Sequence, residues 1–68
     1  MAQSFARWLI RQASREDAIG ALAKDAKRDP GFPKEGDVEA VRRRLREIQA
    51  EGETFAVVDD AEMEWPGG

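Results

Sequence analysis

Apolar residues recur along the chain at the three- and four-residue spacings of amphipathic helices. Near the N-terminus, Phe5, Trp8 and Leu9 fall at i, i+3 and i+4, so one helix face carries all three. Ser4 precedes them and is a suitable N-cap, because its hydroxyl can accept a hydrogen bond from a free backbone N–H of the first turn. The pattern predicts a helix over residues 5–12, with Phe5, Trp8 and Leu9 in the core.

A second helix is predicted from the capping-box spacing of Ser14 and Asp17, a hydroxyl followed three residues later by a carboxylate. Gly20 lowers helix propensity by about 1 kcal/mol relative to Ala, so we expect it to allow a close contact with another helix. Leu22 is assigned to the core. The apolar stripe consists mainly of small residues, namely Ala18, Ile19, Leu22, Ala23 and Ala26.

Two prolines interrupt the helical pattern after residue 29. Pro30 and Pro33 disfavour helical geometry in the residue before each of them, so Phe32 lies in a short extended segment. This segment is either a corner at which Phe32 fills a gap in the core or a loop that binds a ligand. The corner is favoured, with Phe32 and Pro33 as structural residues.

A third helix is expected to begin after Asp37, a good N-cap, and to end at Gly52, which can adopt the left-handed conformation that closes helices. Glu39 and Glu47 each lie four residues from Arg43, so we expect them to pair with it. The apolar face of this helix consists of Val38, Val41, Leu45 and Ile48, of which Val41, Leu45 and Ile48 are assigned to the core together with Leu22.

The last segment fits two secondary structures. Residues 54–58 have the β-branched and aromatic composition of a strand. Alternatively, Phe55, Val58 and Trp65, with Ala61 or Glu62 between them, form one face of a helix that Thr54 would cap. A single strand would lack a pairing partner in an otherwise helical chain, so a fourth helix is favoured. Residues 66–68 are expected to form a flexible tail.

The length and composition limit the function. A chain of 68 residues forms at most one domain. It has no Cys and no His, so disulfides and the usual zinc sites are excluded. It also lacks Tyr, and the common general bases, thiol nucleophiles and phenolic acids are therefore absent. We expect no enzyme activity, no metal site and no cofactor.

Neither a membrane span nor a signal peptide is recognisable. No stretch approaches the ~20 apolar residues that cross a bilayer, and the N-terminus lacks the charged, apolar and cleavage regions of a secretion signal. We expect a cytoplasmic protein without a membrane partner. The oligomeric state stays open.

Charge is distributed unevenly along the chain. All 11 Lys and Arg residues lie in residues 1–50, whereas residues 51–68 carry six acids and no base. Arg42 and Arg46 lie four residues apart and repel each other unless an acid lies nearby. If the second and third helices adjoin, their cations would form one surface that attracts phosphates; these candidate residues are Lys24, Lys27, Arg28, Arg42, Arg43 and Arg46.

Two functions remain open. The sequence lacks the usual catalytic side chains and has amphipathic helices. Both features favour a small module that binds another protein. The alternative is nucleic-acid binding through the basic faces, although the sequence pI of about 4.9 lies far below the value above 9 that is usual for such domains. Ile10 and Met63 lie off the main apolar faces and are conceivable contact points.

Three segments carry a more specific pattern: SFARWLIRQ, REDAIGALAKDAKRDPGFPK and VEAVRRRLREI. Over about residues 3–50 they resemble the YozE-type family of small bacterial proteins, which have a SAM-like (sterile alpha motif-like) fold. The residues that match the family pattern are Ser4, Phe5, Trp8, Leu9, Asp17, Ile19, Gly20, Leu22, Ala23, Asp25, Asp29, Phe32, Pro33 and Lys34.

The C-terminal segment departs from this pattern. The family closes with a helix of the form F-D-x-A-W-x-x-Y, whereas this chain has Glu62 where the first large aromatic is expected. The resemblance implies an all-α SAM-like bundle of four or five helices, in a single domain over residues 1–65. It implies little about activity, because SAM-like folds include both protein-binding and nucleic-acid-binding members.

Overall fold

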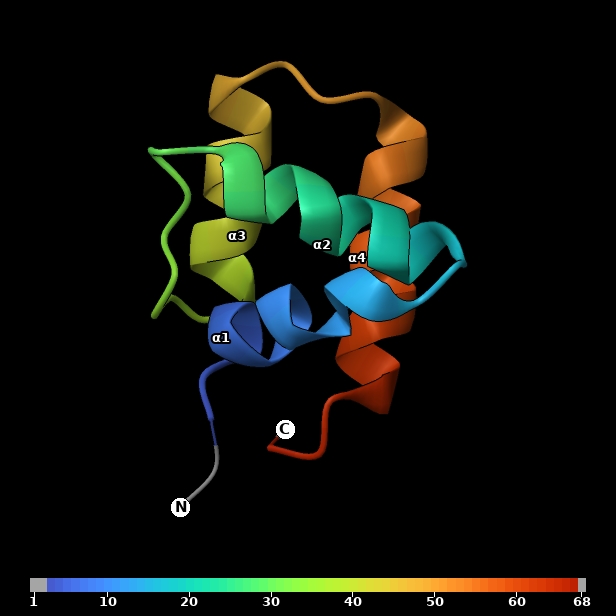
Figure 1. The fold of residues 1–68 in the computed structure, drawn as a ribbon. Coiled ribbons are helices and arrows are strands. Elements are labelled where there is room, and N and C mark those ends of the chain that lie inside the picture. Colours follow the sequence, from blue (N-terminus) through green and yellow to red (C-terminus); the bar gives the residue numbers. More distant parts are fainter. Residues whose placement is uncertain (1–2, 68) are drawn as a thin grey trace.

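The computed structural model describes residues 3–67 and is a helical bundle without strands in that range (Figure 1). Helix α1 (Phe5–Ile10) continues into a 3₁₀ turn, η1 (Arg11–Ser14). Helices α2 (Ala18–Arg28), α3 (Val38–Glu47) and α4 (Gly52–Glu64) follow. Helices α3 and α4 run side by side in opposite directions, α2 crosses in front of them, and α1 closes one end (Figure 1). The predicted all-α single-domain bundle is confirmed.

The core forms where one face of each helix meets the others. Phe5, Leu9, Val41 and Val58 are completely buried. Phe32 from the segment between α2 and α3 joins them with 6% of its surface exposed, so its prediction as a core residue is confirmed. The remaining buried apolar residues are Ala6, Ile19, Leu22, Ala23, Ala26, Val38, Leu45 and Ala61.

Three of the predicted core residues lie nearer the surface. Trp8 and Pro33 are partly buried, and Trp8 packs against the edge of the core. Ile48 is 50% exposed, so its assignment to the core is wrong. Helix α3 ends at Glu47, and Ile48 is its C-cap, whose backbone is no longer helical. The helical spacing that places Val41 and Leu45 on the buried face therefore does not extend to the side chain of Ile48.

The helix starts follow the predicted caps in two cases out of four, namely Ser4 and Asp37. The Arg7 N–H donates to Ser4 Oγ at 3.2 Å, and the Ala40 N–H donates to Asp37 Oδ1 at 2.9 Å. The prediction of Ser14 as the cap of α2 is wrong, because Ser14 ends η1. Asp17 is the N-cap and accepts a hydrogen bond from the Gly20 N–H at 2.9 Å.

Gly20 is required by a close approach, as expected, although its neighbour is not another helix. A Cβ atom at this position would lie 2.0 Å from the carbonyl oxygen of Arg15. The turn that leads into α2 therefore folds directly against the first turn of the helix. Any other residue at position 20 would push the two backbones apart.

The connection between α3 and α4 corrects two predictions. Gln49 adopts the left-handed conformation (φ 58°), and the N–H groups of Gln49 and Ala50 donate to the carbonyls of Arg46 and Leu45. These two bonds form a Schellman motif, which ends α3 before Gly52 is reached. Gly52 is instead the first residue of α4, and Thr54 lies inside that helix rather than capping it. The preference for a fourth helix over a strand is confirmed.

Aromatic residues join the two ends of the chain. The Trp65 indole N–H donates to the carbonyl of Gln3 at 3.1 Å. The Trp65 ring meets the Phe5 ring edge-on, with 5.7 Å between centroids, and Trp8 lies 6.2 Å from Phe5. Of the predicted tail, Pro66 and Gly67 form a turn beside Trp65, and Gly68 lies outside the described residues.

Candidate functional site

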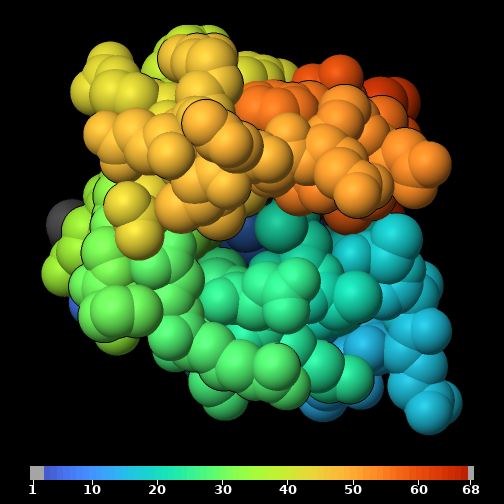
Figure 2. Space-filling view, turned by 90° about the horizontal axis from the view of Figure 1, so that it is seen from above, coloured from blue at the N-terminus to red at the C-terminus, as the bar shows by residue number. Residues whose placement is uncertain are grey.

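A groove lies between α2 and the connection from α3 to α4 (Figure 2). At one end, Leu22, Ala26, Phe32, Leu45 and Ile48 surround an almost entirely apolar hollow of about 100 Å³. Leu22 and Asp25 also line a second hollow, of about 210 Å³, so the two hollows are adjacent.

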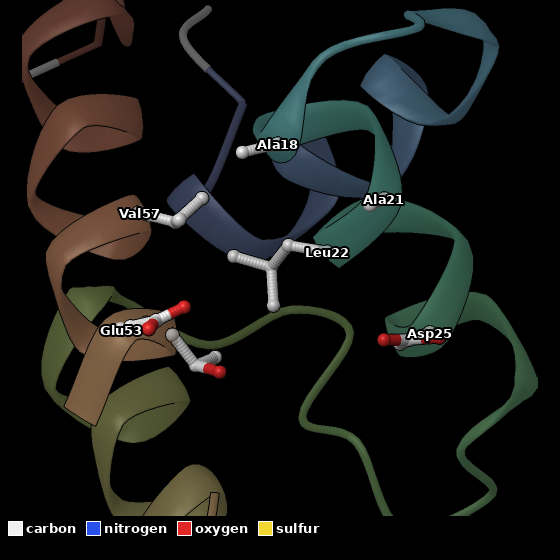
Figure 3. A pocket seen from close by; sticks show the side chains of 7 residues that line it. Ala18, Ala21, Leu22, Asp25, Glu53 and Val57 are labelled. Atoms are coloured by element: carbon white, nitrogen blue, oxygen red, sulfur yellow. The ribbon is translucent and has the colours of Figure 1, made fainter. Parts of the chain in front are cut away.

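The second hollow owes its width to small side chains on the flank of α2. Ala18 and Ala21 form its α2 wall, and Val57 with Thr54 forms its α4 wall (Figure 3). Helices that pack through larger side chains would fill this space. Because an alanine extends only a methyl group from the backbone, a ligand in the groove can approach α2 closely.

Two carboxylates stand on opposite walls of this hollow. Asp25 belongs to α2 and Glu53 to α4, with Leu22 between them (Figure 3). Both residues are exposed, and neither forms an ion pair with another residue in the range 3–67. The groove thus combines an apolar floor with free negative charge at its rim.

Asp29, at the end of the apolar hollow, is held by a two-point ion pair. Arg44 donates from Nε to Asp29 Oδ2 at 2.9 Å and from Nη2 to Oδ1 at 2.7 Å. These bonds, with a further one from the Gly31 N–H, lower the pKa of the Asp29 carboxyl, and the same pair raises the pKa of Arg44. A Cβ atom at Gly31 would lie 2.5 Å from Arg44 Nη2, so a side chain there would displace the guanidinium from its present position. The pair fastens the segment around Phe32 to α3.

Arg42 joins α3 to α4. Its Nη2 donates to Asp59 Oδ1 at 2.6 Å and to Glu62 Oε1 at 3.1 Å, while Nη1 reaches Glu39 Oε1 at 3.4 Å. The hydrogen bond to Asp59 is the main reason that the pKa of Arg42 is raised. The acids of the C-terminal segment therefore neutralise a cation that had been assigned to the basic surface.

The predicted pairing of Arg43 with Glu39 and Glu47 is wrong. Glu39 pairs with Arg42, and Glu47 pairs with Arg44 at 3.4 Å. Arg43 follows the buried Val41 by two residues, which places it on the outer side of α3. Glu39 and Glu47 pair at i, i+3 rather than with Arg43, because Asp59 and Asp29 already hold Arg42 and Arg44 on the flanks of the helix.

The remaining candidate cations do not meet on one surface. Lys24, Lys27 and Arg28 border a shallow hollow that Ala13 and Ser14 of η1 complete. Arg43 and Arg46 are exposed on α3, and Figure 2 shows α2 and the end of α3 on opposite sides of the groove. The six residues thus separate into an α2 group, an outer α3 pair and the neutralised Arg42.

A further ion pair closes the end of the bundle near the chain termini. Arg15 donates from Nη1 to Glu64 Oε1 at 2.8 Å and from Nη2 to Asp17 Oδ2 at 2.6 Å. The pKa of the Asp17 carboxyl is lowered, first by the bond from the Gly20 N–H and then by Arg15. Neither Arg15 nor Arg44 was singled out from the sequence. Besides a local acid, each has a distant partner, Glu64 for Arg15 and Asp29 for Arg44, 49 and 15 residues away and beyond the reach of helical spacing.

Within the described part of the chain, no three acidic side chains are grouped to bind a metal ion. The helices in that part include none with the length and apolar character of a membrane span.

A family model described as YozE SAM-like fold matches residues 4–65. The chain belongs to the YozE SAM-like family. No curated protein and no solved structure shows significant similarity to it. The resemblance inferred from residues 3–50 is thereby confirmed, and the match continues through α4. In this YozE SAM-like protein, Glu62 replaces the aromatic expected from the pattern and accepts a hydrogen bond from Arg42.

Proposed function

We propose that this YozE SAM-like protein is a non-enzymatic module that binds another protein through the groove beside α2. The observation that carries the proposal is the half-exposed Ile48, which borders a hollow whose other apolar members, Leu22, Ala26, Phe32 and Leu45, are buried. Covering this surface with an apolar side chain of a partner removes it from water, which is favourable. Ile48 is held at this place by the Schellman motif of α3.

The dimensions of the groove support binding rather than catalysis. Its two hollows measure about 100 and 210 Å³, below the roughly 300–1,000 Å³ of typical small-molecule sites. Where an acidic and a basic side chain are in contact, they form an ion pair with a structural role, such as the pair of Asp29 with Arg44. The polar side chains that line the wider hollow are Asp25, Glu53 and Thr54.

The test compares two substitutions of exposed apolar residues. Tagged native protein, Ile48→Asp and Met63→Asp are used to capture proteins from a nuclease-treated lysate of the host. Met63 is 86% exposed and does not line the groove, so it is the matched control. We expect a stoichiometric partner with the native protein and with Met63→Asp that is lost with Ile48→Asp. Equal recovery with all three would refute binding through the groove.

Nucleic-acid binding is the second candidate, and the α2 group of cations favours it. Lys24, Lys27 and Arg28 border one hollow and form no ion pair with another residue in the range 3–67. Phosphate contacts by these side chains would give an affinity that falls steeply with salt.

A mobility-shift assay at low salt separates the two candidates. The triple variant Lys24→Glu, Lys27→Glu, Arg28→Glu is compared with Arg43→Glu, Arg46→Glu. Arg42→Glu is unsuitable, because it would place a fourth carboxylate among Glu39, Asp59 and Glu62. A salt-dependent shift that only the triple variant abolishes would support nucleic-acid binding, and the absence of any shift would exclude it.

A further inference from the structure

We infer that the occupant of the groove is a cationic amphipathic helix of another protein. This inference rests on the proposed function and adds the chemistry and the shape of the partner segment. Three features of the groove carry it: the charge at its rim, the absence of a sheet edge beside it, and the size of its apolar hollow.

The rim charge selects a basic partner. Asp25 and Glu53 face each other across the wider hollow, and neither is neutralised by a base within residues 3–67. Lys24 and Lys27, the nearest bases in sequence to Asp25, belong to the hollow bordered by η1 instead. Complementary charge guides a partner and fixes its orientation, so Lys or Arg side chains on both flanks of a segment match these two walls.

The surrounding secondary structure selects a helix. One recurring way of binding an extended peptide is to add it as a strand to an exposed sheet edge, and residues 3–67 contain no strand. Helices bind to apolar grooves through residues at i, i+3, i+4 and i+7. The small side chains of Ala18 and Ala21 leave room for such a helix to lie against α2 (Figure 3).

The apolar hollow selects the anchor. Its volume of about 100 Å³ is smaller than the ~150 Å³ cavity that holds benzene in another protein. A branched aliphatic side chain such as Leu or Ile fits it better than a bulky aromatic one. The anchor would contact Ile48, Phe32 and Leu45, while the charged flanks of the same helix reach Asp25 and Glu53.

The experiment is a selection from displayed helix-forming peptides. Each peptide carries a fixed Leu stripe at i, i+4 and i+7, and the flanking positions vary among Lys, Glu and Ser. Peptides that bind the native protein but not Ile48→Asp are sequenced. We expect enrichment of Lys at the flanks. The double variant Asp25→Lys, Glu53→Lys should select Glu instead and should weaken the Lys-rich peptides by about tenfold.

A matched control reverses two exposed acids outside the groove. Glu16 and Asp60 are exposed, line neither hollow of the groove, and form no ion pair with another described residue. The variant Glu16→Lys, Asp60→Lys should bind the Lys-rich peptides as the native protein does. If this control loses as much affinity for the Lys-rich peptides as the groove variant does, the loss is due to overall net charge, and the inference is overturned.

The outcomes distinguish this inference from the proposed function. If Ile48-dependent partners are captured from the lysate but no helical peptide, or only acidic ones, is selected, the inference fails and the proposed function stands. If neither partners nor peptides depend on Ile48, both fail. A second copy of this chain is the remaining alternative occupant. The oligomeric state of the native protein and of Ile48→Asp, measured by sedimentation, tests it, because self-association that requires Ile48 would assign the groove to that second copy.

Discussion

The two faces of α4 use their acids differently. Toward α3, Asp59 and Glu62 hold Arg42, so their charge links two helices. Toward α2, Glu53 stands opposite another acid, Asp25, and nothing described in the chain neutralises either. Toward α2, Glu64 also pairs with Arg15 at one end, so the side left open by unpaired charges is the part where α2 passes the start of α4. The open side is where we place the partner.

The largest effect is expected at Phe32, where the closed part of the bundle borders the groove. Truncation by Phe32→Ala removes a buried ring and should lower the free energy of unfolding by about 3–5 kcal/mol, which is measured by urea denaturation. Ile48→Ala, at the half-exposed wall of the same hollow, should cost less than ~1 kcal/mol. A Phe32 effect as small as that of Ile48 would contradict the role of the ring in the core.

The next effect is expected at the ion pair between Asp29 and Arg44. Either Asp29→Ala or Arg44→Ala should lower Tm, by less than Phe32→Ala, because each leaves a partly buried charge without its partner. The double variant should be less damaging than the sum of the two single changes, since it removes both charges together. Additive effects in thermal unfolding would show that the two residues act independently.

Acid should destabilise the bundle through the paired carboxylates of Asp17 and Asp29. The pKa values of Asp17 and Asp29 lie below the ordinary 3.8 in the folded protein. The unfolded chain therefore binds more protons as the pH falls below about 3.8, so the stability from these groups is full above that pH and is lost as the pH falls through the folded pKa values. The urea midpoint should therefore decrease less steeply with falling pH in Asp29→Asn than in the native protein.

The smallest effect on stability is expected at the open rim. Asp25→Asn with Glu53→Gln should leave Tm unchanged or raise it slightly, because the two free carboxylates repel each other across the hollow. The same variant should bind a Lys-flanked peptide more weakly in a fluorescence anisotropy titration. A clear fall in Tm would mean that these acids support the fold rather than a partner.

Much of the fold could be predicted from helical periodicity. The spacing of Phe5 and Leu9, and of Val41 and Leu45, places each pair on a buried face, and the two prolines leave Phe32 to fill the corner. Ends of helices were harder, because several residues compete for each cap. Gln49 adopts the left-handed conformation that ends α3, although glycine, as at Gly52, has the higher intrinsic preference for it. The N-cap of α2 is the carboxylate of Asp17 and not the hydroxyl of Ser14.

The candidate site could be predicted only in its parts. The small residues Ala18 and Ala21 and the lone acid Asp25 are visible in the sequence. Their importance depends on where α4 brings Glu53 and where α3 ends, which local spacing does not reveal. The same reason explains why Arg43 was expected to pair and Arg44 was not, since the partner that holds Arg44 belongs to another segment.

The position of the two tryptophans has a practical consequence. Trp8 and Trp65 both lie beside Phe5, and neither lines the groove. Intrinsic indole emission therefore reports on the junction where the chain ends meet, and it will follow unfolding of the whole bundle. It will be almost silent when a ligand docks beside α2, so a binding assay requires a dye attached near the start of α4.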